Sequence, residues 1–116
     1  MATADLTVIS LGRADASASL YIAEMYRRLA RQDKVHYVLH GMGTSLEGTP
    51  EDIFAVVAEL HSIPFEFGIP RVYSVLKLDE RRDRDQTLAD KVEAVQARLR
   101  EEGVSTSGGG EAPLSP

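Results

Sequence analysis

The chain has 116 residues, which is enough for one domain with one modest hydrophobic core. Its formal net charge of −5 gives no electrostatic support for binding nucleic acid, because such proteins usually present a basic face. The chain contains no cysteine, which excludes disulfides, thiolate nucleophiles and metal sites with cysteine ligands.

The apolar segments of the chain are short. None approaches the roughly 20 residues that a helix needs to cross a bilayer. The first residues, MATADLTVISLG, lack the basic segment that opens a signal peptide. We therefore expect a cytoplasmic protein with no membrane partner.

The first part of the chain predicts three strands and one helix. Residues 6–12 are β-branched and apolar, which is typical of a strand. The period then changes, and residues 18–31 predict an amphipathic helix with one apolar stripe. Residues 34–39 and 42–48 predict two further strands, with Gly41 in the tight turn between them.

The segment TPED marks the start of a second helix. Thr49 can accept a hydrogen bond from the amide of Asp52, and Pro50 suits the first helical position. Near the end of this helix, Pro64 lacks an amide donor. We expect it to interrupt the helix, kinking or weakening the last turn before Gly68.

The last part of the chain predicts a strand, a helix and a tail. Residues 71–79 read as the fourth strand. A third helix is capped at Thr87, and its apolar stripe comprises Leu88, Val92, Val95 and Leu99. Residues 103–116 are rich in glycine, serine and proline, so we expect a disordered tail after a folded domain spanning residues 4–102.

This order predicts an α+β protein. Its first six elements match the split βαβ pattern, a ferredoxin-like βαββαβ sandwich, and the last helix is an addition. The first and fourth strands are apolar on both faces, which is typical of strands that are covered on both sides. Because two helices cover one face, a partner subunit, the third helix or a ligand must cover the other. We expect oligomerisation.

Four short stretches point to a family: ISLG, MGTSLEG, RVYSVLKLDERRDR and TLADKVEAV. Their order and spacing resemble the small thiamine-binding proteins of ferredoxin-like fold, over about residues 5–101 of the chain. The resemblance implies a non-catalytic protein that binds thiamine or its hydroxymethylpyrimidine half. It also implies self-association as a homodimer or a homotetramer built from dimers, with thiamine as the candidate ligand and no other cofactor.

Polar side chains in the predicted strands are candidates for the ligand site. The two-residue period places Thr44 on one face of its strand and both Ser45 and Glu47 on the other. We expect Ser10, either Thr44 or Ser45, and Glu47 to converge near one end of the sheet. The full candidate set, including residues of the family motifs, is Ser10, Leu11, Gly12, Met42, Thr44, Ser45, Glu47 and Tyr73.

Each principal candidate also has a simpler interpretation. Glu47 is our first choice for recognising charge and the pyrimidine amine, although exposed glutamate near a turn is the norm. Thr44 is a candidate partner of the pyrimidine, or an ordinary strand residue. Tyr73 is placed either to stack on a ring or to lie at a subunit interface.

The histidines and the charged run give weaker signals. His36 and His40 share a strand face, but the sequence offers no clear third ligand, so we expect no metal site. His61 is expected to be a hydrogen-bonded structural residue. Residues 79–85, DERRDRD, predict a solvated loop of ion pairs.

No nucleophile, base and acid occur in a catalytic pattern, and no phosphate-binding loop is present in the sequence. Two alternatives to a binding protein stay open. One is a small oligomeric enzyme on the same scaffold, for which His40 is the weak candidate base. The other is a structural interaction module without a small ligand, because this fold hosts many functions.

Overall fold

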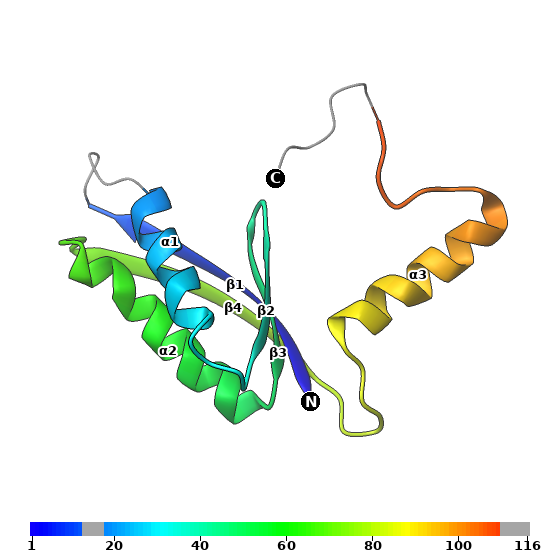
Figure 1. Ribbon diagram of the computed structural model, residues 1–116, viewed down its shortest axis with the longest axis horizontal. Helices are drawn as coiled ribbons and strands as arrows, with labels where there is room; N and C mark the ends of the chain where they lie inside the picture. Colours follow the sequence, from blue (N-terminus) through cyan, green and yellow to red (C-terminus); the bar gives the residue numbers. More distant parts are fainter. Residues whose placement is uncertain (13–17, 110–116) are drawn as a thin grey trace.

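The computed structural model describes residues 1–12 and 18–109, and it has an α+β fold with three helices and one four-stranded antiparallel sheet (Figure 1). The predicted order βαββαβ with a further C-terminal helix is confirmed. The elements are β1 (Ala2–Leu11), α1 (Ala18–Leu29), β2 (His36–His40), β3 (Gly43–Gly48), α2 (Pro50–Glu66), β4 (Arg71–Glu80) and α3 (Leu88–Glu102).

The strands lie in the order β2-β3-β1-β4, and all neighbours are antiparallel. Strand β1 starts at Ala2, earlier than predicted, because its first residues pair with β3 on one side and β4 on the other. Strand β2 starts later than predicted. The side chain of Gln32 accepts hydrogen bonds from the amides of Lys34 and Val35, which holds these two residues in a loop.

Helices α1 and α2 cover one face of the sheet, and the core lies between them and the strands (Figure 1). The buried apolar side chains come from every strand except β2 and β4, from both helices and from the loops; they include Leu6, Tyr21, Met25, Leu29, Val35, Leu46, Ile53, Leu60 and Ile63. We call the other face of the sheet the open face. It includes Thr3, Asp5, Ser45 and Glu47, which the register places side by side.

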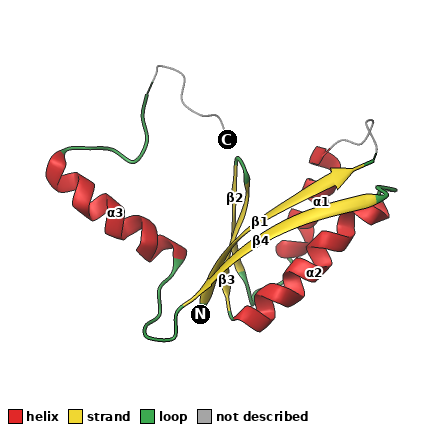
Figure 2. Ribbon diagram, turned by 180° about the vertical axis from the view of Figure 1, so that it is seen from behind, coloured by secondary structure: helices red, strands yellow, loops and turns green. Residues whose placement is uncertain are grey.

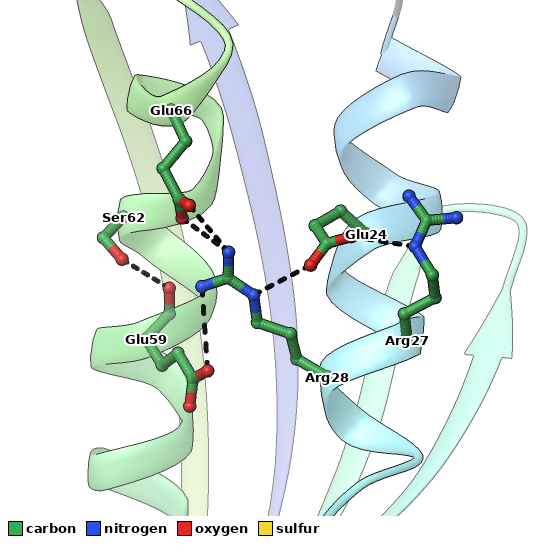
Figure 3. Close-up of polar contacts among 6 residues, drawn as sticks. All are labelled: Glu24, Arg27, Arg28, Glu59, Ser62 and Glu66. Atoms are coloured by element: carbon green, nitrogen blue, oxygen red, sulfur yellow. Dashed lines mark hydrogen bonds and ion pairs between the residues drawn. The ribbon is translucent and has the colours of Figure 1, made fainter.

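An ion-pair cluster joins the two covering helices on their outer side (Figure 3). Arg28 of α1 donates from Nη2 to both carboxylate oxygens of Glu66 in α2, at 2.8 Å each. Its Nε donates to Glu24 at 3.0 Å, and Nη1 lies 3.7 Å from Glu59. The hydrogen bonds from Arg27 and then Arg28 lower the pKa of Glu24 below its usual value.

Helix α2 begins as predicted, and it ends just before Gly68, with Phe67 as its last capping residue. The Thr49 side chain accepts a hydrogen bond from the Asp52 amide, and Pro50 is the first helical residue. The expectation that Pro64 interrupts the helix is wrong, since the helix continues to Glu66. The Pro64 ring is buried and its carbonyl accepts hydrogen bonds from the amides of Phe67 and Ile69, which stabilise the end of the helix.

Helix α3 stands apart from the rest of the molecule (Figure 1, Figure 2). Thr87 and Asp90 form a reciprocal capping box at its start, and Gly103, with φ of 71°, ends it. None of its residues is buried; in its predicted apolar stripe Val92 and Val95 are exposed, whereas Leu88 and Leu99 are half-buried. Residues 110–116 of the expected tail lie outside the described residues.

No helix among the described residues is long and apolar enough to span a membrane.

Candidate functional site

The candidate residues divide between the two faces of the sheet. Ser10 and Thr44 lie on the face that the helices cover, whereas Ser45, Glu47 and Tyr73 lie on the open face. The expected convergence of Ser10 with Glu47 is therefore wrong. Even-numbered residues of β1 point toward the helices, and Glu47 is opposite odd-numbered Thr3.

A small cavity lies at the turn between β2 and β3, on the helix side. We call it the hairpin pocket; its volume is about 260 Å³, and its lining is Leu6, Thr7, Val8, Ile22, Met25, Leu39, His40, Gly41, Met42, Gly43 and Thr44. The sheet forms its floor, α1 forms one wall and the hairpin tip forms another. The pocket brings the candidates Met42 and Thr44 together.

Thr44 is the buried polar group of the hairpin pocket. Its side chain is only 3% exposed, and its Oγ1 lies 2.5 Å from the hydroxyl of Tyr26. The Tyr26 ring also packs edge-on against Tyr37, with centroids 5.9 Å apart. Burial raises the pKa of Tyr26 above its usual value, although its hydrogen bond with Thr44 acts in the opposite direction. Tyr26 is therefore a neutral phenol that can orient the Thr44 hydroxyl.

Contacts with β1 hold the hairpin tip in place. Thr7 Oγ1 donates to the carbonyl of Met42 at 3.1 Å. On the open face, His40 Nε2 lies 2.8 Å from Asp5 Oδ1, and His40 Nδ1 accepts the amide of Met42 at 3.3 Å. The last contact assigns the proton to Nε2. The wall of the hairpin pocket is thus tied to two open-face side chains of β1, Thr7 and Asp5.

The remaining residues of the first-strand motif lie beyond this pocket. Tyr21 donates its hydroxyl to Ser10 Oγ at 3.3 Å, which places Ser10 against α1. Gly12 has φ of 91°, and a Cβ there would lie 2.7 Å from Pro70 Cγ. Leu11 is opposite Arg71 on the open face. None of the three lines the hairpin pocket.

A second, larger hollow lies between the open face and α3. We call it the α3 groove; its volume is about 780 Å³, and its lining is His36, Val38, Ser45, Glu47, Leu88, Ala89, Asp90, Lys91, Val92, Glu93 and Gln96. Glu47 Oε2 accepts the amide of Leu88 at 2.9 Å. Lys91 donates to Thr3 at 2.6 Å and to Asp79 at 2.7 Å. Glu47 thus joins the start of α3 to the sheet.

Comparison with known proteins decides the family. A model described as thiamine-binding protein matches residues 4–96. The chain belongs to the thiamine-binding protein family. A UPF0045 protein from Bacillus subtilis is 38% identical over 102 residues, covering 85% of this chain and 98% of that protein. A UPF0045 protein from Methanothermobacter thermautotrophicus is 41% identical over 100 residues, covering 85% of this chain and all of that protein (100%).

Solved structures have the same fold as this member of the thiamine-binding protein family. A hypothetical protein from Methanocaldococcus jannaschii has a TM-score of 0.71 at 33% identity, covering 82% of this chain and 95% of that one. A putative thiamine biosynthesis/salvage protein from Thermotoga maritima has a TM-score of 0.66 at 21% identity, covering 81% of this chain and 97% of that one. The second likeness shows the fold alone.

Other predicted features of this family member have structural roles. Nδ1 of His61 lies 2.6 Å from Ser74 Oγ, so the prediction of a hydrogen-bonded histidine is confirmed. The described part of the charged run contains ion pairs, including Arg82 with Glu80 at 3.1 Å. Among residues 1–12 and 18–109, no three His, Asp or Glu side chains are grouped to hold a metal ion.

Three residues in these contacts were missed at the level of sequence: Asp5, Tyr26 and Lys91. Tyr26 lies beside the apolar stripe of α1, and its contact with Thr44 depends on how α1 packs on β3. Asp5 breaks the apolar alternation of β1, which was the available signal that it faces the open side. Tyr73, by contrast, was a candidate site residue. It lies in β4 as predicted, but it lines neither the hairpin pocket nor the α3 groove.

Proposed function

We propose that this protein is a non-catalytic binder of thiamine or its hydroxymethylpyrimidine half, and that the pyrimidine occupies the hairpin pocket. The observation that carries the proposal is the buried Tyr26–Thr44 hydroxyl pair beside a small apolar cavity. Membership of the thiamine-binding protein family supports the ligand class. A small-molecule site is typically an apolar cavity with a few placed polar groups.

The chemistry of an aminopyrimidine fits this pocket. Its flat ring needs an apolar slot, which Leu6, Ile22 and Met25 provide. Its amine donates and its ring nitrogens accept, and the Thr44 hydroxyl can serve either group. Because Tyr26 holds that hydroxyl from behind, the pocket wall is oriented before the ligand arrives. We place the cationic thiazolium at the hairpin tip, where the Met42 side chain is 82% exposed.

A small enzyme is the second candidate, because the structure contains a histidine–carboxylate pair beside the pocket. His40 lines the hairpin pocket and contacts Asp5. Both ring nitrogens of His40 are already engaged, by Asp5 and by the Met42 amide, so neither is free to take a substrate proton. We therefore favour binding. Conversion of thiamine during incubation with the protein, followed by chromatography, would favour the enzyme instead.

Thermal denaturation with thiamine, hydroxymethylpyrimidine and thiamine phosphates tests the ligand class. A ligand at 100 times its dissociation constant stabilises the folded state by about 2.7 kcal/mol. For a domain of this size, that corresponds to a rise in Tm on the order of 10 °C. No rise with any of these compounds would contradict the proposal.

Two neighbouring residues on opposite faces test the location. Thr44→Val keeps the shape of the side chain but removes the hydroxyl, and we expect it to weaken binding about tenfold, the equivalent of one hydrogen bond. Ser45→Ala is the matched control on the open face and should leave affinity unchanged. Calorimetric titration of both variants measures this. Loss of affinity in Ser45→Ala and Glu47→Gln, but not in Thr44→Val, would move the ligand to the α3 groove.

We also propose that the folded domain spans residues 4–102, is ferredoxin-like, works in the cytoplasm and self-associates. Self-association is supported by exposed apolar side chains that face solvent on both the open face and α3; they are Ile9, Val38, Tyr73, Val75, Val92 and Val95. A homodimer or homotetramer would cover them. Light scattering that gives the monomer mass of 12.7 kDa at micromolar concentration would contradict this.

A further inference from the structure

We propose that the neutral imidazole of His40 positions the tip of the β2–β3 hairpin, and that protonation of this ring releases the tip and weakens ligand binding. The effect on binding rests on the function proposed above for the hairpin pocket, whereas the positioning role concerns the free protein as well. Three observations carry the proposal: the backbone of the turn, the contacts of the His40 ring, and the place of this ring in the wall of the pocket.

The turn at the tip of the hairpin lacks the backbone conformation that such turns favour (Figure 1). His40 pairs with Gly43, so Gly41 and Met42 form a two-residue loop. Two-residue hairpins favour type I′ or II′ turns, which need a positive φ at one or both loop residues. Neither Gly41 nor Met42 has a positive φ. Side-chain contacts therefore hold this tip where the usual local preference is missing.

Two side chains hold the backbone of Met42. Thr7 Oγ1 donates to its carbonyl at 3.1 Å, and His40 Nδ1 accepts its amide at 3.3 Å. A threonine hydroxyl does not titrate near neutral pH, whereas an imidazole does. The contact from His40 is therefore the one that depends on pH.

Protonation changes one nitrogen of the His40 ring and leaves the other as it is. Nε2 carries the proton that Asp5 accepts at 2.8 Å, and it carries this proton in both forms of the ring. The added proton goes to Nδ1, which then becomes a donor that faces another donor, the Met42 amide. The protonated ring thus retains Asp5 and loses Met42.

The His40 ring lies between the hairpin pocket and a hollow of about 450 Å³ on the open face. The other charged residues that line this hollow are Asp5 of β1, Lys77 and Asp79 of β4, and Lys91 of α3. Lys91 donates to Asp79 at 2.7 Å, which leaves Asp5 as the carboxylate beside the ring. With 39% of its side chain exposed, His40 can exchange protons with the solvent.

The helix side of the hairpin adds no further titration near neutral pH. Among the described residues that line the hairpin pocket, His40 is the one with a titratable side chain. Tyr26 stands behind Thr44, and burial raises its pKa, so its phenol stays neutral. A pH dependence of the pocket therefore points to His40.

The segment that His40 holds is a wall of the hairpin pocket, since Gly41, Met42 and Gly43 all line it. A ligand that needs this wall in place binds the neutral form of His40 more tightly, and by linkage its binding expels the proton. Affinity should therefore fall as pH decreases from about 8 to about 5, the range in which histidines take up a proton. Loss of one hydrogen bond corresponds to a decrease of about threefold to tenfold.

Two substitutions separate the roles of the two ring nitrogens. His40→Asn keeps an acceptor near the place of Nδ1, as in an Asx turn, but it cannot titrate. His40→Gln places its amide near the position of Nε2, where it can donate to Asp5 but leaves the Met42 amide unpaired. We expect His40→Gln to bind weakly at both pH values. His36→Asn removes a histidine from the same face of β2 and should retain the wild-type pH profile.

Calorimetric titration with hydroxymethylpyrimidine at about pH 8 and pH 5 measures these affinities. This compound lacks the fixed positive charge of thiamine, so repulsion of a cationic ligand by protonated His40 does not contribute. Titration of the compound itself is common to all variants. We expect the affinity of the wild-type protein to fall threefold to tenfold more than that of His40→Asn. Equal decreases in these two proteins would overturn the proposal.

Hydrogen exchange in the ligand-free protein tests the contact without any ligand. Corrected for the intrinsic effect of pH, protection of the Met42 amide should decrease as the His40 ring takes up its proton, whereas the Leu46 amide in the middle of β3 should stay protected. Unchanged protection of Met42 would overturn the proposal, whatever binds. Absence of binding at both pH values, with Met42 still following His40, would contradict the proposed ligand and support the positioning role.

Discussion

Gly43 starts β3 at a point where this strand lies close to the backbone of β1. A Cβ at this position would lie 2.5 Å from the carbonyl oxygen of Leu6 and 3.0 Å from Thr7 Oγ1. Gly43→Ala is therefore expected to push the two strands apart and to lower the free energy of unfolding by about 1–3 kcal/mol, the usual cost of overpacking. Urea denaturation measures this loss.

Gly41 gives the matched control, two residues away in the same hairpin. A Cβ there meets no atom within 4 Å, and its φ is not in the left-handed region. Gly41→Ala should be close to neutral, or slightly stabilising through reduced freedom of the unfolded chain. Equal losses in the two variants would show that the close approach to Leu6 does not require glycine.

Single residues were partly predictable from the sequence. The two-residue period correctly separated Thr44 from Ser45 and Glu47, because side chains in a strand alternate between faces. It did not reveal which face the helices cover or that Thr44 meets Tyr26. Those facts depend on how α1 packs against β3, a contact between residues far apart in the chain.

At the scale of elements, the start of α3 is sensitive to acid. The Asp90 carboxylate accepts the Thr87 amide at 3.0 Å, and this bond, then the bond from the Thr87 side chain, lowers the pKa of Asp90. Arg84 lowers it further. Because the folded pKa lies below the unfolded value of about 3.9, the stabilisation is complete above that value and is lost as pH falls through the folded pKa.

We therefore expect the first turn of α3 to fray as pH falls from 5 toward 2. Asp90→Asn retains an acceptor for the Thr87 amide, but its side chain cannot titrate. The Thr87 amide resonance of this variant should therefore shift much less between pH 5 and pH 2 than that of the wild-type protein. The Thr87 amide donates to Asp90 itself, so it is the diagnostic probe in NMR. The same pH profile in both proteins would exclude Asp90 as the cause.

The sequence predicted the elements better than their placement. Caps at Thr49 and Thr87 act within one turn, so their local patterns were sufficient. The apolar stripe of α3 was also predicted, but the sequence does not specify what covers it. In the structure the middle of this stripe, Val92 and Val95, is exposed, and no α3 residue is buried. Pro64 was misjudged because its burial against the core is a tertiary effect.

At the scale of the whole molecule, the protein consists of a sheet-and-helix body and an attached helix. The body contains all of the buried apolar cluster, whereas α3 is joined to it by the contacts of Leu88 and Lys91 with the sheet. This division separates two roles. The body maintains the fold and contains the hairpin pocket, whereas in the proposed self-association α3 would cover the open face of a second copy.

Truncation after Gln86 tests this division. Because α3 contributes no buried residue, we expect the free energy of unfolding of the truncated chain to lie within about 1 kcal/mol of that of the intact chain at low protein concentration. Leu46→Ala is the contrasting variant. The Leu46 side chain is fully buried, so its truncation should lower the free energy of unfolding by about 2–5 kcal/mol. Urea denaturation measures both.

The oligomeric state of the same truncated chain tests the part that α3 takes in the proposed self-association. If α3 covers the open face of a second copy, light scattering should give a monomeric mass for the truncated chain, because Val92 and Val95 are then missing from the contact. A truncated chain that associates as the intact chain does would show that the copies are held together without α3.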